Sequence, residues 1–257
     1  MNQLRNTLGA LALGLSLVAA PVAAGATLSL EGVTRVNTNP VVPPFDLSDA
    51  GGVDWAYWNQ TSGTGVATMA PGNEKAGGTA ISDLAPSGGA TVRGTGSATT
   101  VGRYSWSDGA STPTSGTNQP LTGGLIFNST IGSTNGNGLG VQFTLVGDPT
   151  TARDATLYFG GFSATGNLTL EMNGVSTVVD SSQVFTAIGP KQMAVYRVRY
   201  QPDSVNDVLT VRYTATSITD GNGHVGVQAV AVAVPEPGVI GLGVVGIGMC
   251  LARRRAR

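Results

Sequence analysis

The chain has 257 residues, of which only 11% are charged, and its formal net charge at pH 7 is −1. Because Arg5 and the C-terminal arginines supply part of the positive charge, residues 25–234 carry a net charge of about −5, which disfavours nucleic acid and anionic lipid as partners. The one cysteine, Cys250, lies near the C-terminus, which excludes a disulfide framework, a cysteine nucleophile and a cysteine-ligated zinc from residues 25–234.

Residues 1–24 have the features of a secretory signal peptide. The charged residue Arg5 precedes an apolar run from Leu8 to Val18, and the small residues of "PVAAGA" then offer a cleavage site after Ala24 or Ala26. We therefore expect signal peptidase to remove this segment as the protein is exported across the inner membrane.

The next segment, residues 25–233, is predicted to form one β-rich body. Apolar and polar residues alternate with the period of a strand in several stretches, and an Asn173-Gly174 pair marks a hairpin turn between two of them. The predicted strands are Leu139–Leu145, Leu168–Met172, Val175–Val179, Ala194–Tyr200, Leu209–Ala215 and Val225–Val234. Val225–Val234 is apolar at almost every position, which predicts burial on both faces.

No stretch between residues 27 and 234 has a helical period, so the fold class is predicted as all-β, a single antiparallel β-sandwich. The glycine-, serine- and threonine-rich residues 63–122 are expected to form long loops around one strand at Val101–Trp106. The length suits a single sandwich domain with a sizeable core.

Three tryptophans, Trp55, Trp58 and Trp106, are the candidate ligand-stacking residues. In a strand, Trp55 and Tyr57 share one face and Trp58 takes the other. Packing in the core is the favoured interpretation, and the alternative is a platform on which sugar rings stack.

His224 is the only histidine and lies in the turn-like sequence "DGNGH", where we expect a solvent-facing residue. Asp220 and Asn222 alternate with it like calcium ligands, and Asp203, Asn206 and Asp207 offer a second weak set, but the bidentate acid that completes a calcium loop is missing. Turn formation by these side chains is favoured, so no metal and no cofactor is predicted.

The C-terminal sequence "VPEPGVIGLGVVGIGMCLARRRAR" has three parts in order. Residues 238–252 are uncharged and would form a helix about 22 Å long, short for a hydrocarbon core of about 30 Å. The arginines that follow can snorkel and mark the cytoplasmic side, so we expect a membrane span. These membrane-stop residues are Arg253, Arg254, Arg255 and Arg257.

Other interpretations of this segment are less favoured. Residues 241–246 fit the glycine pattern of dinucleotide-binding loops, but no acidic residue follows at the distance that binds a ribose. A buried core helix would not need the flanking arginines, and lipidation of Cys250 is supported by nothing else in the sequence.

Residues 234–257 as a whole closely resemble the PEP-CTERM sorting signal of Gram-negative bacteria. The resemblance rests on Pro235, Glu236 and Pro237, the short apolar span and the arginine-rich end, in that order. It implies that a membrane enzyme of the exosortase type cleaves near these three residues and releases or re-attaches the protein outside the cell.

The body resembles a recurrent ectodomain of PEP-CTERM proteins, in a diffuse way that extends over about 180 residues. The stretches that carry the resemblance are "DWAYWN", "YSWSDG", residues 139–174, "VYRVRYQ" and "DVLTVRYTAT". It implies a galactose-binding-like jelly roll, and a function carried over from it would rest on analogy alone.

These features predict an exported, non-enzymatic cell-surface or extracellular-matrix protein that is transiently anchored by its C-terminal span. The alternative is a surface module that binds carbohydrate, namely exopolysaccharide, through its tryptophans. An exported hydrolase is the least favoured class, because the body has no G-x-S-x-G elbow and its acidic residues are scattered.

Overall fold

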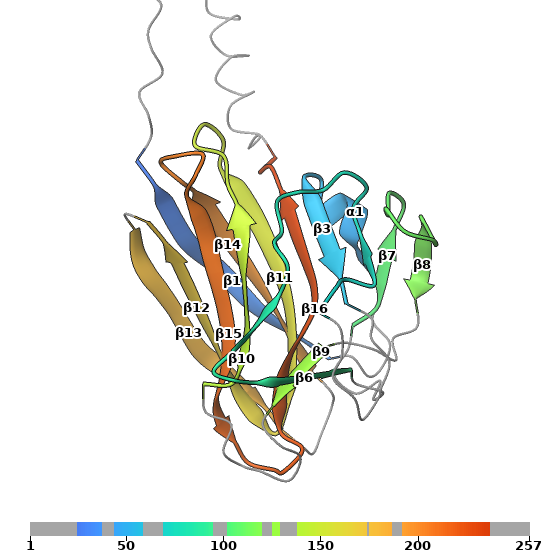
Figure 1. Ribbon diagram of the computed structural model, residues 1–257, viewed down its shortest axis with the longest axis vertical. Coiled ribbons are helices and arrows are strands. Elements are labelled where there is room, and N and C mark those ends of the chain that lie inside the picture. The colour runs from blue at the N-terminus through green and yellow to red at the C-terminus, as the bar shows by residue number, and fades with distance from the viewer. Residues whose placement is uncertain are drawn as a thin grey trace, which may run out of the picture.

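The computed structural model describes residues 25–37, 44–58, 69–94, 102–119, 125–128, 138–173, 175–186 and 192–236. Almost all of the regular structure in these ranges is β-strand, and the two larger sheets are antiparallel and pack as a β-sandwich (Figure 1). This confirms the all-β prediction. The expected signal peptide and the expected span at 238–252 lie outside the described residues.

The larger sheet has eight strands in the order β1-β14-β11-β16-β3-β4, with β9 also pairing with β16 and β6 pairing with β9. All of its pairs are antiparallel. Its strands are β1 (Thr27–Asn37), β3 (Asp54–Tyr57), β4 (Asn73–Glu74), β6 (Thr91–Gly94), β9 (Leu125–Asn128), β11 (Arg153–Phe162), β14 (Gln192–Gln201) and β16 (His224–Ala233).

The second sheet has five antiparallel strands in the order β13-β12-β15-β10-β5. Its strands are β5 (Ala85–Ser87), β10 (Gly140–Val146), β12 (Ala164–Met172), β13 (Val175–Phe185) and β15 (Val208–Ile218). β12 and β13 pair with Met172 opposite Val175, which confirms the hairpin predicted at Asn173-Gly174.

The main core lies between these two sheets. The ring of Phe159 on β11 stacks on Tyr213 of β15 with a centroid distance of 4.1 Å, and both side chains are fully buried. Buried positions alternate with exposed or half-buried ones along β12, along residues 196–200 of β14 and along residues 208–213 of β15, as the sequence predicts. Met193 and Val195, on the outer face of β14, are also buried. Burial of these apolar residues is the main source of stability for such a body.

A third layer covers part of the outer face of the eight-stranded sheet. It consists of the short helix α1 (Leu47–Ala50) and a three-stranded sheet, β2 (Phe45–Asp46), β7 (Tyr104–Trp106) and β8 (Gly116–Gln119). Figure 1 shows α1 beside β3, with β7 next to them and β8 on the outer side of β7. A second apolar cluster, which includes Trp55, Tyr104 and Trp106, fills the space between this layer and the sheet.

The third layer explains the composition of β16. Val230 and Val232 belong to the main core, whereas Ala229 and Ala231 belong to the second cluster, so the strand is buried on both faces as predicted. A strand buried on both faces has no position for a solvated side chain, which accounts for its nearly continuous apolar sequence.

The prediction of loops around one strand in residues 63–122 was incomplete. The structure places β4, β5, β6, β7 and β8 there, each two to four residues long. Strands of this length carry too few residues to show a period of two, and their pairing depends on distant partners.

The helix α1 was also not predicted, because one turn of helix is too short to show a helical period. Its N-cap is Asp46, whose carboxylate accepts from the N–H groups of Ser48 and Asp49 at 3.0 and 3.2 Å.

Candidate functional site

The N- and C-terminal exits of the described body lie at the same end of the eight-stranded sheet. Thr27, the first residue of β1, pairs with Gln201 at the end of β14. Ala233, the last residue of β16, pairs with Asp154 near the start of β11, and β11 in turn pairs with the end of β14. Because the strand order is β1-β14-β11-β16, these exits are three strand spacings apart, about 14 Å. Figure 1 shows the start of β1 and the end of β16 at the same end of the sandwich.

The predicted sorting residues begin directly after β16. Pro235 is half-buried and Glu236 is exposed, and Pro237 lies outside the described residues. Proline has no backbone N–H to offer a sheet, so Pro235 ends the ladder that holds Ala233. Glu236 is therefore presented to solvent three residues after the end of β16.

This exit segment forms one wall of a groove of about 690 Å³, which we call the exit groove. Its other surfaces come from β1, α1, β11 and β14, on the part of the sheet face that the third layer leaves uncovered. The lining residues are Glu31, Asp49, Ala50, Asp154, Ala155, Thr156, Arg197, Val198, Arg199, Ala233, Val234, Pro235 and Glu236.

Two arginines of β14 have different surroundings in the exit groove. Arg199 donates from Nε and Nη2 to both carboxylate oxygens of Asp154, at 2.8 and 2.9 Å, and this hydrogen-bonded pairing raises the pKa of Arg199. Arg197 is exposed, and no carboxylate of the described chain lies within 4.0 Å of its guanidinium. The groove thus contains one neutralised cation and one that is available to a partner.

The three candidate stacking residues lie inside the protein. Trp55, Trp58 and Trp106 are 0%, 1% and 5% exposed. A sugar-stacking platform needs an exposed ring face, so these rings cannot serve as one, and the core interpretation is confirmed. The predicted division of faces is also confirmed, since Trp58 packs in the main core and Trp55 in the second cluster.

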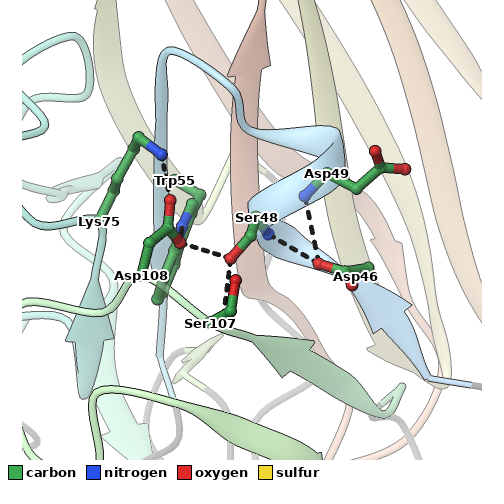
Figure 2. Close-up of polar contacts among 7 residues, drawn as sticks. All are labelled: Asp46, Ser48, Asp49, Trp55, Lys75, Ser107 and Asp108. Carbon is green, nitrogen blue, oxygen red and sulfur yellow. Dashed lines mark hydrogen bonds and ion pairs between the residues drawn. The ribbon is translucent and has the colours of Figure 1, made fainter.

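Figure 2 shows a polar cluster that sequence reasoning missed. The carboxylate of Asp108 accepts from Trp55 Nε1 at 2.8 Å and also from Ser48 Oγ and Lys75 Nζ. Asp108 follows β7, and its partners belong to α1, to β3 and to the residue after β4. These partners are 33 to 60 residues away in sequence, so no local pattern could have indicated the contact.

The arrangement around Asp108 suits structural support better than proton transfer. Partial burial acts to raise the pKa of Asp108, but the hydrogen bonds from Lys75, Ser48 and Trp55 outweigh it and hold this pKa below its usual range. A general base works best with a pKa near the working pH and with a free lone pair aimed at its substrate. Asp108 instead ties the third layer to the sheet.

The prediction of a solvent-facing His224 was wrong. His224 is 9% exposed, begins β16 and stacks on Phe162 at 5.9 Å. Its Nδ1 lies 2.8 Å from the carbonyl oxygen of Asn222, and within the described ranges its Nε2 has no hydrogen-bond partner. Burial lowers the pKa of His224, and the hydrogen bond to Asn222 only partly offsets this.

The weak calcium candidates form a turn. Asp220 accepts from the backbone N–H of Asn222 at 2.7 Å, which is the local bond of an Asx turn, and Asp207 accepts from Asn173 at 3.1 Å. Within the described ranges, no group of three or more His, Cys, Asp or Glu side chains is placed to hold a metal ion.

The chain matches no model of a known protein family, and no curated protein is significantly similar to it. In the part of the chain that the structure covers, no helix has the length and apolarity required to cross a bilayer. The predicted membrane-stop residues, Arg253 to Arg257, lie outside that part.

Proposed function

We propose that this chain is an exported, non-enzymatic cell-surface or extracellular-matrix protein that is processed through a PEP-CTERM-type signal at residues 234–257. Signal peptidase removes residues 1–24, the apolar segment 238–252 holds the protein transiently in the inner membrane, and an exosortase-type enzyme then cuts near Pro235, Glu236 and Pro237. The processed body reaches the cell surface or the exterior.

The observation that supports this proposal best is the position of Glu236. It is exposed and follows the end of β16 by only three residues, between a stiff proline and the start of the apolar segment. Proteases bind their substrates as extended chains, and the two prolines disfavour a helix at this point. A cutting enzyme could therefore reach the segment without unfolding the sandwich.

We also propose that the sandwich is a jelly roll of the galactose-binding-like kind, because two antiparallel sheets enclose its core. The alternative function, exopolysaccharide binding, had the tryptophans as its basis. All three are buried, so none of them offers a ring face on which a sugar could stack.

The proposal is tested by following the full-length protein in its native host after synthesis is stopped. The wild-type protein should lose its C-terminal arginines and leave the inner membrane, whereas a Glu236→Ala variant should accumulate at full length in that membrane. Glu74→Ala, at an exposed position on β4, is the matched control and should be processed normally. Normal processing of Glu236→Ala would reject the proposed role of the signal.

A further inference from the structure

The folded body and the expected membrane segment are separated by very little chain. β16 ends at Ala233, and the apolar segment is expected to begin at Gly238. Even when fully extended, the residues between them span about 17 Å. A single α-helix with its side chains is about 10–12 Å across, so roughly one layer of protein fits between the sandwich and the bilayer.

The N-terminal end adds to this restriction. β1 begins at Thr27, three residues after the expected cleavage site at Ala24, and its start lies about 14 Å from the end of β16 by strand spacing. Both ends of the body therefore leave from the edge that would face the membrane. An enzyme that cuts at Glu236 must work within this gap and cannot avoid the body.

The surface that such an enzyme would meet is the exit groove, because Val234, Pro235 and Glu236 form one of its walls. Any group that holds Glu236 from the groove side also meets the opposite surfaces on β11 and β14. Arg197 is the exposed cation there without an ion pair among the described side chains, since Arg199 is bound to Asp154.

The charges of the groove favour a protein over a lipid surface. Glu31, Asp49 and Glu236 line the groove, and within the described residues none of them is in an ion pair. An anionic bilayer would be repelled by these three carboxylates. A peptide segment can direct one carboxylate at Arg197 and N–H donors at the acidic side chains, and it then gives both the cation and the carboxylates of the groove a partner.

We propose that the membrane enzyme that cuts the tail recognises the folded sandwich as well as Pro235-Glu236-Pro237, through a peptide segment that enters the exit groove and pairs one carboxylate with Arg197. This inference rests on the proposed function, since it concerns the same processing event. It makes Arg197 a positioning residue, which holds the body so that Glu236 lies in the enzyme's active site.

The test measures the rate at which full-length protein is processed in the native host, for matched variants. Arg197→Ala should slow processing by roughly five- to tenfold, Arg197→Glu should slow it further, and Arg197→Lys should restore part of the rate. The control is Arg212→Ala on β15 of the other sheet, which should change the rate less than about twofold. Resistance of each variant to added protease checks that the sandwich remains folded.

A second arm inserts six glycine and serine residues between Val234 and Pro235. This insertion disconnects the groove from the cut segment, so the difference in rate between wild type and Arg197→Ala should shrink to about twofold or less. A positioning role predicts this loss of coupling, whereas a general loss of stability in Arg197→Ala would leave the difference unchanged.

The outcomes separate this inference from the proposed function. If Glu236→Ala blocks processing while Arg197→Ala and Arg197→Glu proceed at the wild-type rate, the tail alone is recognised and the inference is overturned, but the function stands. If Arg212→Ala slows processing as much as Arg197→Ala does, general attraction to the anionic bilayer explains the effect and the inference fails. If the wild-type protein is never cut, both fail.

Discussion

The indole nitrogen of Trp55 lies 2.8 Å from a carboxylate oxygen of Asp108, 53 residues further along the chain. The same carboxylate holds Ser48 of α1 and Lys75, so one side chain connects the third layer to the eight-stranded sheet. Asp108→Ala leaves the buried indole N–H without its partner, which should lower the free energy of unfolding by about 2 kcal/mol.

This prediction is checked by urea denaturation followed by tryptophan fluorescence. Asp203→Ala is the control, because Asp203 is exposed and its side chain forms no ion pair within the described residues. The two variants should differ clearly in their denaturation midpoints. Equal midpoints would mean that the Asp108 cluster does not hold the third layer in place.

A second prediction concerns Trp58, and its test distinguishes a role in core packing from a role in ligand binding. Trp58 is 1% exposed in the main core and donates its indole N–H to the carbonyl oxygen of Met69 at 3.0 Å. Trp58→Ala should lower the free energy of unfolding by roughly 3–5 kcal/mol, as for other large-to-small core changes. An unchanged stability with lost binding on a glycan array would show instead that the ring is a ligand contact.

The third prediction is a loss of stability on mild acidification. Burial lowers the pKa of His224 in the folded state, whereas an unfolded histidine has a pKa of about 6.5. The unfolded state therefore binds the proton more readily below this value. Stability should be unaffected by His224 above about pH 6.5 and should fall as the pH drops below it, by at most about 1.4 kcal/mol per pH unit.

The contribution of His224 is isolated by comparison with His224→Gln. Unfolding free energies of the two proteins are measured by denaturant titration between pH 5 and pH 7.5, and the wild type should show the steeper decrease. Parallel curves would indicate that His224 is as easily protonated in the folded protein as in the unfolded chain.

The fourth prediction tests the close approach of two strands at Gly140. A Cβ added to Gly140 on β10 would lie 2.0 Å from the backbone carbonyl oxygen of Tyr213 on β15, and backbone cannot rotate away as a flexible side chain can. Gly140→Ala should therefore destabilise the five-stranded sheet by several kcal/mol, on the order of other overpacked cores. Gly32→Ala on β1 has open space around its Cβ and should shift the thermal midpoint very little.

The sequence was sufficient for most of the long strands, but it missed β1 and β11 as well as most of the short strands. The alternation of β12, of residues 196–200 on β14 and of residues 208–213 on β15 reflects one face in the core and one nearer to solvent, which is a local property of each strand. The continuous apolar run of β16 correctly predicted burial on both faces. It could not show that α1 and the three-stranded sheet cover the outer face, because the pairing of Phe45 with Tyr104 depends on residues far apart in the chain.

The candidate site shows the same limit. The order of Pro235, Glu236 and the apolar segment is visible in the sequence, because a linear signal consists of consecutive residues. The exit groove could not be predicted from the sequence, because most of its charged side chains come from β1, α1, β11 and β14, which are far apart in the chain. His224 was misjudged for a related reason: "DGNGH" is a turn sequence, but its last residue is already the first residue of a buried strand.

The most direct test of the proposed sorting function is the intact mass of the protein recovered from membrane, surface and medium fractions of its native host. The account predicts a species that begins near Gly25, ends near Pro237 and lacks the C-terminal arginines, and any added mass at the new end would identify an anchor. A species that retains Arg257 and stays in the inner membrane would contradict the account, because the tail would then be a permanent anchor rather than a processed signal.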